Sequence, residues 1–114
     1  MRILGLCFAG TSTPHRESMS EFVDAVLGLP RRRVEGVEAD LFGLPDGSSF
    51  AVASPTGMGE TDRSLGFLVE SLDEAVTELN AAGIATDEPA TNEVERYVHF
   101  TAPDGHLYEL VERL

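Results

Sequence analysis

The sequence contains the same four-residue turn motif twice. Residues 44–47 read Leu-Pro-Asp-Gly, and residues 102–105, 58 positions later, read Ala-Pro-Asp-Gly. A short apolar stretch follows each motif, and an amphipathic stretch that ends in a glycine precedes each, at Gly28 and at Gly83. A chain that repeats its turns and helix ends at this interval is built from two copies of one structural unit, which limits the folds open to it.

The two copies share one predicted order of elements, β-α-β-β-β. Apolar residues that recur at spacings of three and four predict helices at residues 16–27 and 72–82, ended by Gly28 and Gly83, and Ser71 is expected to cap the second. The predicted strands are residues 3–11, 32–35, 38–44 and 48–53, then 64–70, 84–86, 96–101 and 107–112. We therefore expect one α+β domain over residues 1–114, made of βαβββ modules 1–57 and 58–114 with a linker at 55–62.

Negative charge is concentrated in the second module. The chain carries a formal net charge of −12, of which residues 1–57 contribute −2 and residues 58–114 contribute −10. Such a chain repels nucleic acid, and the short cluster of arginines at 31–33 does not reverse this. A cationic ligand would be attracted, although acidic residues that simply keep a small protein in solution are the alternative explanation.

Two further features bear on where the protein resides. The only cysteine, Cys7, allows no internal disulfide, and its place in an apolar strand indicates a buried, unreactive side chain. No stretch approaches the roughly 18 consecutive apolar residues of a membrane span, and the first residues do not resemble a secretory signal. We therefore expect a cytoplasmic protein without a membrane partner.

Three segments, residues 22–29, 65–75 and 99–110, resemble the vicinal oxygen chelate superfamily, which includes glyoxalase I, bleomycin-resistance proteins, fosfomycin-resistance enzymes and extradiol dioxygenases. The resemblance implies that the two modules form a curved mixed sheet with a helix on the convex side of each module and a concave cavity. It also implies a homodimer, since members of this size commonly pair. It does not settle the function, because the same cavity serves metal enzymes and metal-free binding proteins.

The resemblance also implies four positions for metal ligands, two on each module. Carried over residue by residue, these positions fall on Gly5, Ala51, Ser64 and Glu109. Glycine and alanine cannot coordinate a metal ion and serine is a poor ligand, whereas a catalytic divalent ion normally takes three or more protein ligands. We therefore expect the implied cavity to hold no metal ion, and we expect no other cofactor.

Alternation of side chains along the strands predicts which residues face this cavity. Tyr108 and Leu110 are expected to face the helix, as are Phe8, Phe50 and Phe67, which are therefore read as core. The residues expected to contact a ligand are Glu109, His99, Ser64, Gly66, Leu68, Ala51, Ser49, Cys7 and Leu107. Small residues leave an open groove with Glu109 as an anionic anchor. The alternatives are a structural His99 and a Glu109 that pairs with an arginine such as Arg96.

Three functions follow from these expectations. The leading hypothesis is a metal-free protein that binds a bulky, cationic or aromatic small molecule, as the drug-sequestering bleomycin-resistance proteins do. The second is an enzyme with lyase, isomerase or natural-product tailoring activity, in which Glu109 and His99 transfer protons. The third is a regulatory or interaction module without a ligand of its own.

Overall fold

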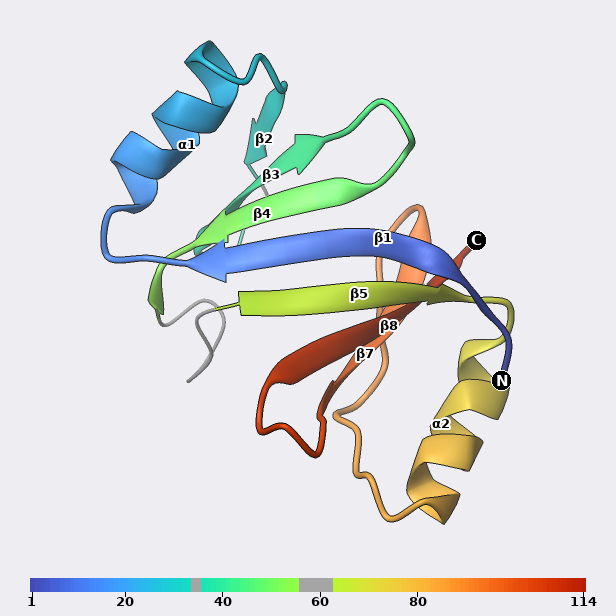
Figure 1. Ribbon diagram of the computed structural model, residues 1–114. Helices are drawn as coiled ribbons and strands as arrows, with labels where there is room; N and C mark the ends of the chain where they lie inside the picture. Colours follow the sequence, from blue (N-terminus) through green and yellow to red (C-terminus); the bar gives the residue numbers. More distant parts are fainter. Residues whose placement is uncertain (34–35, 56–62) are drawn as a thin grey trace. The chain divides into compact units, whose positions relative to one another are not determined.

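The computed structural model describes residues 1–33, 36–55 and 63–114 (Figure 1). The elements run in the order β1 (Ile3–Ser12), α1 (Arg16–Ala25), β2 (Arg31–Arg33), β3 (Ala39–Gly43), β4 (Ser49–Ala53), β5 (Arg63–Val69), α2 (Leu72–Ala81), β6 (Ala90–Thr91), β7 (Glu95–Thr101) and β8 (Leu107–Arg113). This order confirms the predicted α+β class. The predicted module boundary at 57/58 and most of the linker at 55–62 lie outside the described residues.

The chain divides into two compact units, and each is described here by itself. The N-terminal unit comprises Phe8–Ser64, and the C-terminal unit comprises Met1–Cys7 together with Leu65–Leu114. The strand β1 therefore contributes its first half to the C-terminal unit and its second half to the N-terminal unit. No helix among the described residues has the length and apolar character needed to cross a membrane.

The N-terminal unit packs α1 against one face of a mixed sheet. Its strands lie in the order β2-β3-β4-β1, in which β4 runs parallel to β1 and the other neighbours are antiparallel. The helix contacts β3 and β4 (Figure 1). The core comprises Val23, Phe42 and Val52, with Met19, Leu29 and Phe50 packed against it. Phe50 therefore belongs to the core, as predicted.

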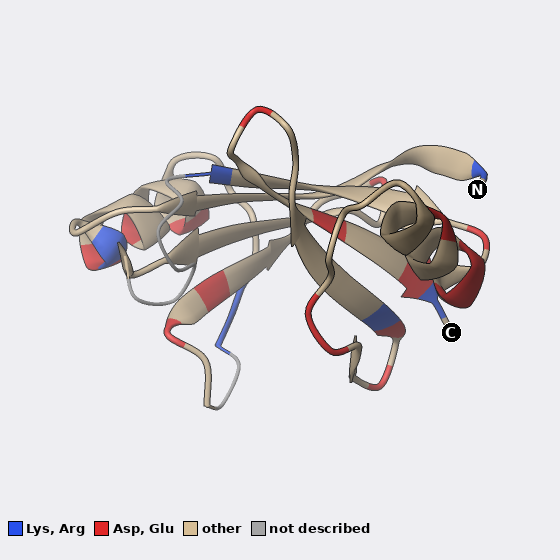
Figure 2. Cartoon of the chain, turned by 90° about the horizontal axis from the view of Figure 1, so that it is seen from below, with Lys and Arg blue, Asp and Glu red and all other residues tan. Residues whose placement is uncertain are grey.

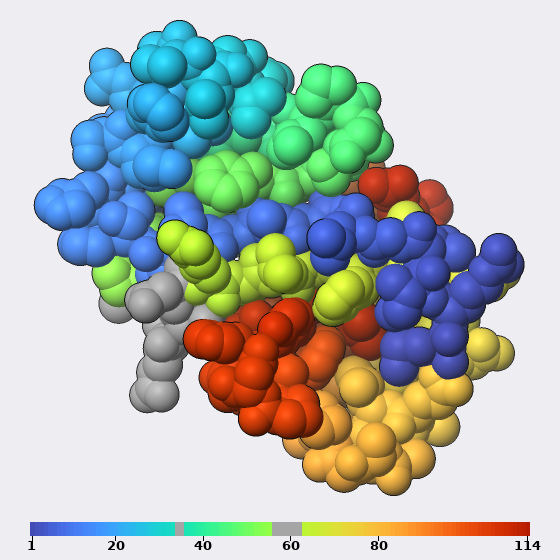
Figure 3. Space-filling model, viewed as in Figure 1, coloured from blue at the N-terminus to red at the C-terminus, as the bar shows by residue number. Residues whose placement is uncertain are grey.

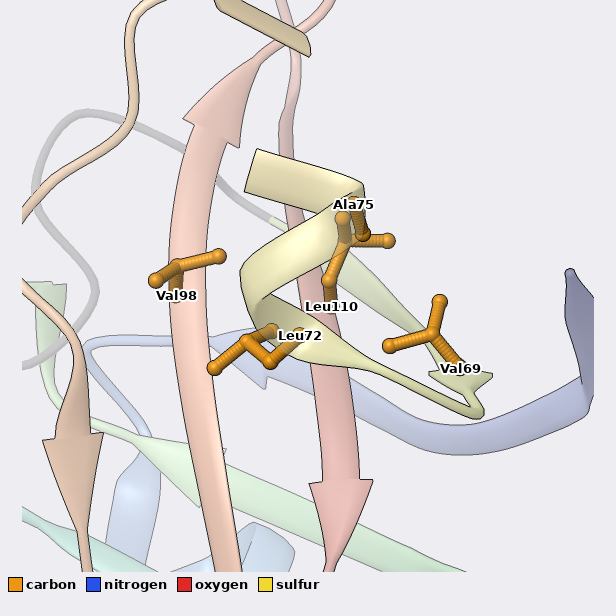
Figure 4. Packing of buried hydrophobic residues seen from close by; sticks show 5 residues of the cluster. All are labelled: Val69, Leu72, Ala75, Val98 and Leu110. Atoms are coloured by element: carbon orange, nitrogen blue, oxygen red, sulfur yellow. The ribbon is translucent and has the colours of Figure 1, made fainter. Parts of the chain in front are cut away.

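The C-terminal unit repeats this arrangement with α2. Its strands lie in the order β5-β8-β7-β6, and α2 contacts β8. Figure 4 shows side chains of Leu72 and Ala75 from the helix near Val69, Val98 and Leu110 from the strands, which together form the core. Phe67 packs against this core, and the ring of Tyr108 stacks on the ring of Phe67 with centroids 6.2 Å apart. The predicted helix-facing side of β5 and β8 is confirmed by these contacts.

The two Pro-Asp-Gly turns have the same geometry. Gly47 and Gly105 adopt φ values of 85° and 83°, a left-handed conformation that glycine reaches without steric cost. Gly47 N–H donates to the Leu44 carbonyl at 3.0 Å, and Gly105 N–H donates to the Ala102 carbonyl at 2.8 Å. The repeat seen in the sequence is therefore a repeat of structure.

Side chains fix the start of α2, and a glycine follows its end. The Ser71 hydroxyl accepts a hydrogen bond from Glu74 N–H at 3.3 Å, which confirms the predicted cap. The Glu112 carboxylate on β8 accepts the N–H of Leu72 at 2.9 Å and so ties the first turn of the helix to the sheet. Gly83, at φ 82°, ends the helix as predicted.

The end of α1 differs from the prediction. The helix stops at Ala25 rather than at residue 27, and Phe22, Val26 and Leu27 are exposed although the apolar spacing placed them in the core. The buried face contains Val23 and Ser20, and the Ser20 hydroxyl donates to the buried carboxylate of Asp40 at 2.7 Å. Val23 and Met19 therefore face the core as their apolar spacing predicts, and Ser20 adds a polar contact on the same side of the helix.

The prediction of a strand at residues 84–86 was wrong. Ile84 N–H donates to the carbonyl of Leu79 in α2, so it is not available to a sheet. Only Thr86 forms an isolated bridge, to Phe100, and the corresponding strand is β6, at Ala90–Thr91. The second unit keeps the β-α-β-β-β order, with its third element displaced along the chain.

Apolar side chains in the first half of β1 lie at the surface. Ile3, Leu4 and Leu6 are about half exposed or more, and the space-filling view shows this part of the chain, in dark blue, on the face turned to the viewer (Figure 3). The first half of β1 therefore contributes little to the core of the C-terminal unit.

Removing core volume beneath α2 should destabilise the protein. Val98 is fully buried in the cluster of Figure 4, so Val98→Ala should lower the free energy of unfolding by about 2 kcal/mol, through lost burial and the cavity left behind. Val94→Ala is the matched control, since Val94 is 58% exposed and its replacement should change the free energy by less than about 0.5 kcal/mol. Urea unfolding of both variants tests this, and equal effects would contradict the assignment of Val98 to the core.

Candidate functional site

A histidine and a buried glutamate face each other across two strands of the C-terminal unit. The antiparallel register of β7 and β8 pairs His99 with Glu109, and His99 Nε2 lies 3.1 Å from Glu109 Oε2. Glu109 is only 7% exposed, and a carboxylate so buried requires a polar partner. The sequence analysis placed these two residues on adjacent strands, and the structure brings them into contact.

Asp87 holds the other side of His99. Its Oδ2 lies 2.8 Å from His99 Nδ1, and its Oδ1 accepts the backbone N–H of His99 at 2.6 Å. Both ring nitrogens of the imidazole therefore face carboxylates. Sequence reasoning missed Asp87, although the residue directly follows Thr86, which the sequence analysis placed in a strand and which bridges Phe100, the neighbour of His99.

The two carboxylates keep the imidazole protonated. The hydrogen bond to Glu109 raises the pKa of His99 from 6.5 to about 9, partial burial acts in the opposite direction, and the hydrogen bond to Asp87 raises it further. At neutral pH both ring nitrogens then carry protons, so His99 has no lone pair for a metal ion or for general-base catalysis. We describe Asp87, His99 and Glu109 as the histidine–carboxylate cluster.

Tyr97 and Cys7 lie in the electrostatic environment of this cluster. The ring of Tyr97 meets that of His99 edge to face, with centroids 5.6 Å apart. Burial, followed by the negative charge of Glu109, raises the pKa of Tyr97 above its usual value of 10. Burial and then the charge of Glu95 raise the pKa of Cys7 to about 11. The thiol therefore stays protonated, and the expectation of a buried, unreactive Cys7 is supported.

Glu109 does not pair with Arg96, the arginine considered in the sequence analysis. Arg96 instead lies 3.2 Å from Asp73 and 3.7 Å from Glu112, on the side of the sheet that carries α2. Side chains alternate along β7 and β8, so Arg96 and Glu112 belong to the opposite face from His99 and Glu109. The neutralising partner of Glu109 is His99.

The other residues predicted to contact a ligand are divided between the two units. In the C-terminal unit Leu68 and Leu107 are half-buried and Gly66 is buried, while in the N-terminal unit Ser49 is half-buried and Ala51 and Ser64 are buried. From the predicted set the structure brings His99 and Glu109 into contact, and it adds Asp87 and Tyr97 to them. The remaining histidines, His15 and His106, are exposed.

A catalytic metal ion of the kind found in related folds does not fit the residues present. Gly5 and Ala51 have no donor atom, Ser64 offers a neutral hydroxyl, and the Glu109 oxygen at the implied position faces a protonated imidazole. Within residues 1–33, 36–55 and 63–114, no group of three or more His, Cys, Asp or Glu side chains has an arrangement that could hold a metal ion.

Solved structures of known proteins share this fold. Methylmalonyl-CoA epimerase from Mycobacterium tuberculosis is 16% identical with a TM-score of 0.72, over 98% of this chain and 89% of that one. A glyoxalase/bleomycin resistance protein/dioxygenase superfamily member from Vibrio splendidus 12B01 is 17% identical with a TM-score of 0.66, over 96% and 99%. The Mn(II)-bound glyoxalase from Novosphingobium aromaticivorans is 15% identical with a TM-score of 0.75, over 96% and 38%.

No family model and no curated protein matches the sequence. The structural likeness confirms the predicted resemblance at the level of the fold: this chain has the fold of the vicinal oxygen chelate proteins. At these identities the likeness carries no substrate from one protein to another.

The cluster predicts an unusual titration of His99. An NMR titration of the wild-type imidazole should give a pKa of about 9, and Glu109→Gln should lower it toward 6.5, because the strongest hydrogen-bonding anion is removed. The matched control Glu93→Gln removes an exposed charge of the same kind and should leave the pKa of His99 unchanged. A wild-type pKa near 6.5 would contradict the described contacts.

The same shift makes the stability depend on pH. Since the pKa of His99 is higher in the folded chain than its usual 6.5, the stabilisation is fully present below pH 6.5 and is lost as the pH rises through about 9. The urea midpoint of the wild type should therefore fall between pH 6.5 and pH 9.5, and that of Glu109→Gln should fall less. A wild-type midpoint that stays constant over this interval would refute the linkage.

Proposed function

We propose that the protein binds a small molecule with a cationic or amide group against the face of the C-terminal unit that carries Glu109. The observation that carries the proposal is the burial of this carboxylate, at 7% exposure, next to His99, whose ring meets that of the half-buried Tyr97. One oxygen of Glu109 faces His99, and a carboxylate has further acceptor capacity for a ligand N–H. Binding without metal chemistry accords with the missing donors at the implied ligand positions.

The charge of the surrounding chain favours such a ligand. Residues 58–114 carry a net charge of −10, and α2 presents Asp73, Glu74 and Glu78 to solvent, among the acidic residues drawn in red in Figure 2. A field of this sign raises the local concentration of cations and their rate of encounter. Once bound, a cation next to Glu109 would gain a charge-assisted hydrogen bond, which is stronger than a neutral one.

Neighbouring residues would supply the apolar contact. Leu68 and Leu107 are half-buried on the strands β5 and β8, and Gly66 adds no side chain. Small-molecule sites are mostly apolar, with a few polar groups that fix orientation. This combination is similar to what the drug-sequestering bleomycin-resistance proteins need, so an antibiotic of that class is a rational first probe. A homodimer remains the assembly expected from the resemblance.

Binding is tested by calorimetric titration of the purified protein with bleomycin and with a panel of aromatic cations. We expect at least one probe to bind saturably. Glu109→Gln should weaken this binding at least tenfold, about 1.4 kcal/mol, because the charge-assisted hydrogen bond is lost. Glu93→Gln, an exposed position, is the control that should bind as the wild type does. Binding that is unaffected by Glu109→Gln would overturn the assignment of the site.

A second candidate function is proton transfer to a bound substrate. The distance of 3.1 Å between His99 Nε2 and Glu109 Oε2 favours it, because a protonated imidazole next to a carboxylate provides one proton donor and one acceptor. In that case activity should decrease as the pH rises through about 9, where His99 loses its proton. Consumption of a bound probe in the same experiments would favour this enzyme over a binding protein.

A further inference from the structure

Two arginines of the N-terminal unit hold one exposed carboxylate between them. Arg31 Nη1 lies 3.1 Å from Oε1 of Glu17, and Arg33 Nη2 lies 3.6 Å from its Oε2; Glu17 is in the first turn of α1. Arg31 and Arg33 occupy alternate positions of β2, so their side chains leave the strand on the same side. All three residues of β2 are arginine, and the strand is blue in Figure 2.

A second carboxylate nearby is already satisfied. Asp40 is completely buried and accepts hydrogen bonds from Arg16 at 3.1 Å and from Ser20 at 2.7 Å, whereas Arg33 is 3.8 Å away. Loss of the contacts with Arg16 and Ser20 would leave the buried charge of Asp40 without close partners, which is energetically costly. Asp40 is therefore a fixed component, and Glu17 is the carboxylate that can move.

Glu17 can leave its place at little cost. Its side chain is 71% exposed, and exposed ion pairs contribute only about 0–1 kcal/mol. Three guanidinium groups, from Arg16, Arg31 and Arg33, are balanced by Asp40, Glu17 and the more distant Asp24, which acts on Arg31 through its charge. When Glu17 turns into solvent, one net positive charge remains at this place.

The side chain of Arg31 is preorganised to bind an anion even when Glu17 is absent. Its side chain is only 16% exposed, and its Nε is buried without a hydrogen-bond partner among the described residues. Burial restricts the side chain, so little conformational entropy is lost when another anion binds. Arginine pairs also match the geometry of phosphate, whose oxygens can accept from two guanidinium groups at once.

We propose that Arg31 and Arg33 form a binding site for a phosphate group, and that Glu17 is an internal occupant which the phosphate displaces. A tethered carboxylate competes as if present at millimolar or higher concentration, so a free monocarboxylate has no advantage over it. Phosphate near neutral pH carries up to two charges and three strong acceptor oxygens, which gives it that advantage. The site lies in the N-terminal unit and is independent of the function proposed above.

The Glu17→Gln variant tests the displacement directly. In calorimetric titration with inorganic phosphate at low salt and pH 7.5, this variant should bind at least tenfold more tightly than the wild type, because the competing anion is gone. Glu21→Gln is the matched control, since Glu21 is an exposed glutamate on the same helix, and it should bind as the wild type does. Failure of Glu17→Gln to show saturable binding of phosphate would overturn the proposal.

Arginine variants then test the site against general charge attraction. In the Glu17→Gln background, Arg33→Gln should abolish binding, and this 68% exposed residue can be replaced without disturbing the core. Arg32→Gln removes the same charge from the other face of β2 and should retain binding. Equal loss in the two variants would show a general charge effect and overturn the site.

A parallel titration with O-phosphoserine separates the two sources of the phosphate group. Binding at least as tight as that of inorganic phosphate would indicate a phosphate monoester, and binding of inorganic phosphate alone would indicate the free ion. Both results support a phosphate site at Arg31 and Arg33, whereas binding of neither compound contradicts it.

Discussion

The register of β7 against β8 places one imidazole between two carboxylates, and the chemistry of the C-terminal unit depends on this arrangement. Glu109 is buried at a position where a charge needs a partner, and His99 supplies it. Asp87 completes the contact from the segment before β6. The negative charge of Glu109 is thereby stabilised in a largely apolar surrounding, while the imidazole is withheld from metal binding and from base catalysis.

The two repeats differ in the positions of their buried charged residues. The Pro-Asp-Gly turns are alike, and the glycines that follow the two helices, Gly28 and Gly83, both adopt positive φ values. The position that corresponds to Glu109 in the first repeat is Ala51, which is buried without a charge. The N-terminal unit instead has its buried carboxylate at Asp40 on β3, where Arg16 and Ser20 of α1 bond to it. The two units thus share a fold and differ in their polar chemistry.

Local interactions explain which features could be predicted from the sequence. The cap at Ser71, the end at Gly83 and both turns depend on neighbouring residues, so their chemistry is readable from the chain alone. Strand alternation placed His99 and Glu109 on the same face of the sheet, whereas their direct contact is known only from the structure. The contacts of Asp87 and of Asp40 depend on residues 12 to 24 positions away, and apolar spacing carries no information on such polar contacts.

Metal binding tests the account most directly, since a protonated His99 and the residues at positions 5, 51 and 64 leave Glu109 without co-ligands. The measurement is calorimetric titration of the chelator-treated protein with zinc and with manganese at pH 7, with proton release followed in buffers of different ionisation enthalpy. The account predicts no binding above background, because a metal would have to displace the proton of His99 held between Asp87 and Glu109. Tight binding of one ion per chain, accompanied by release of a proton, would contradict it.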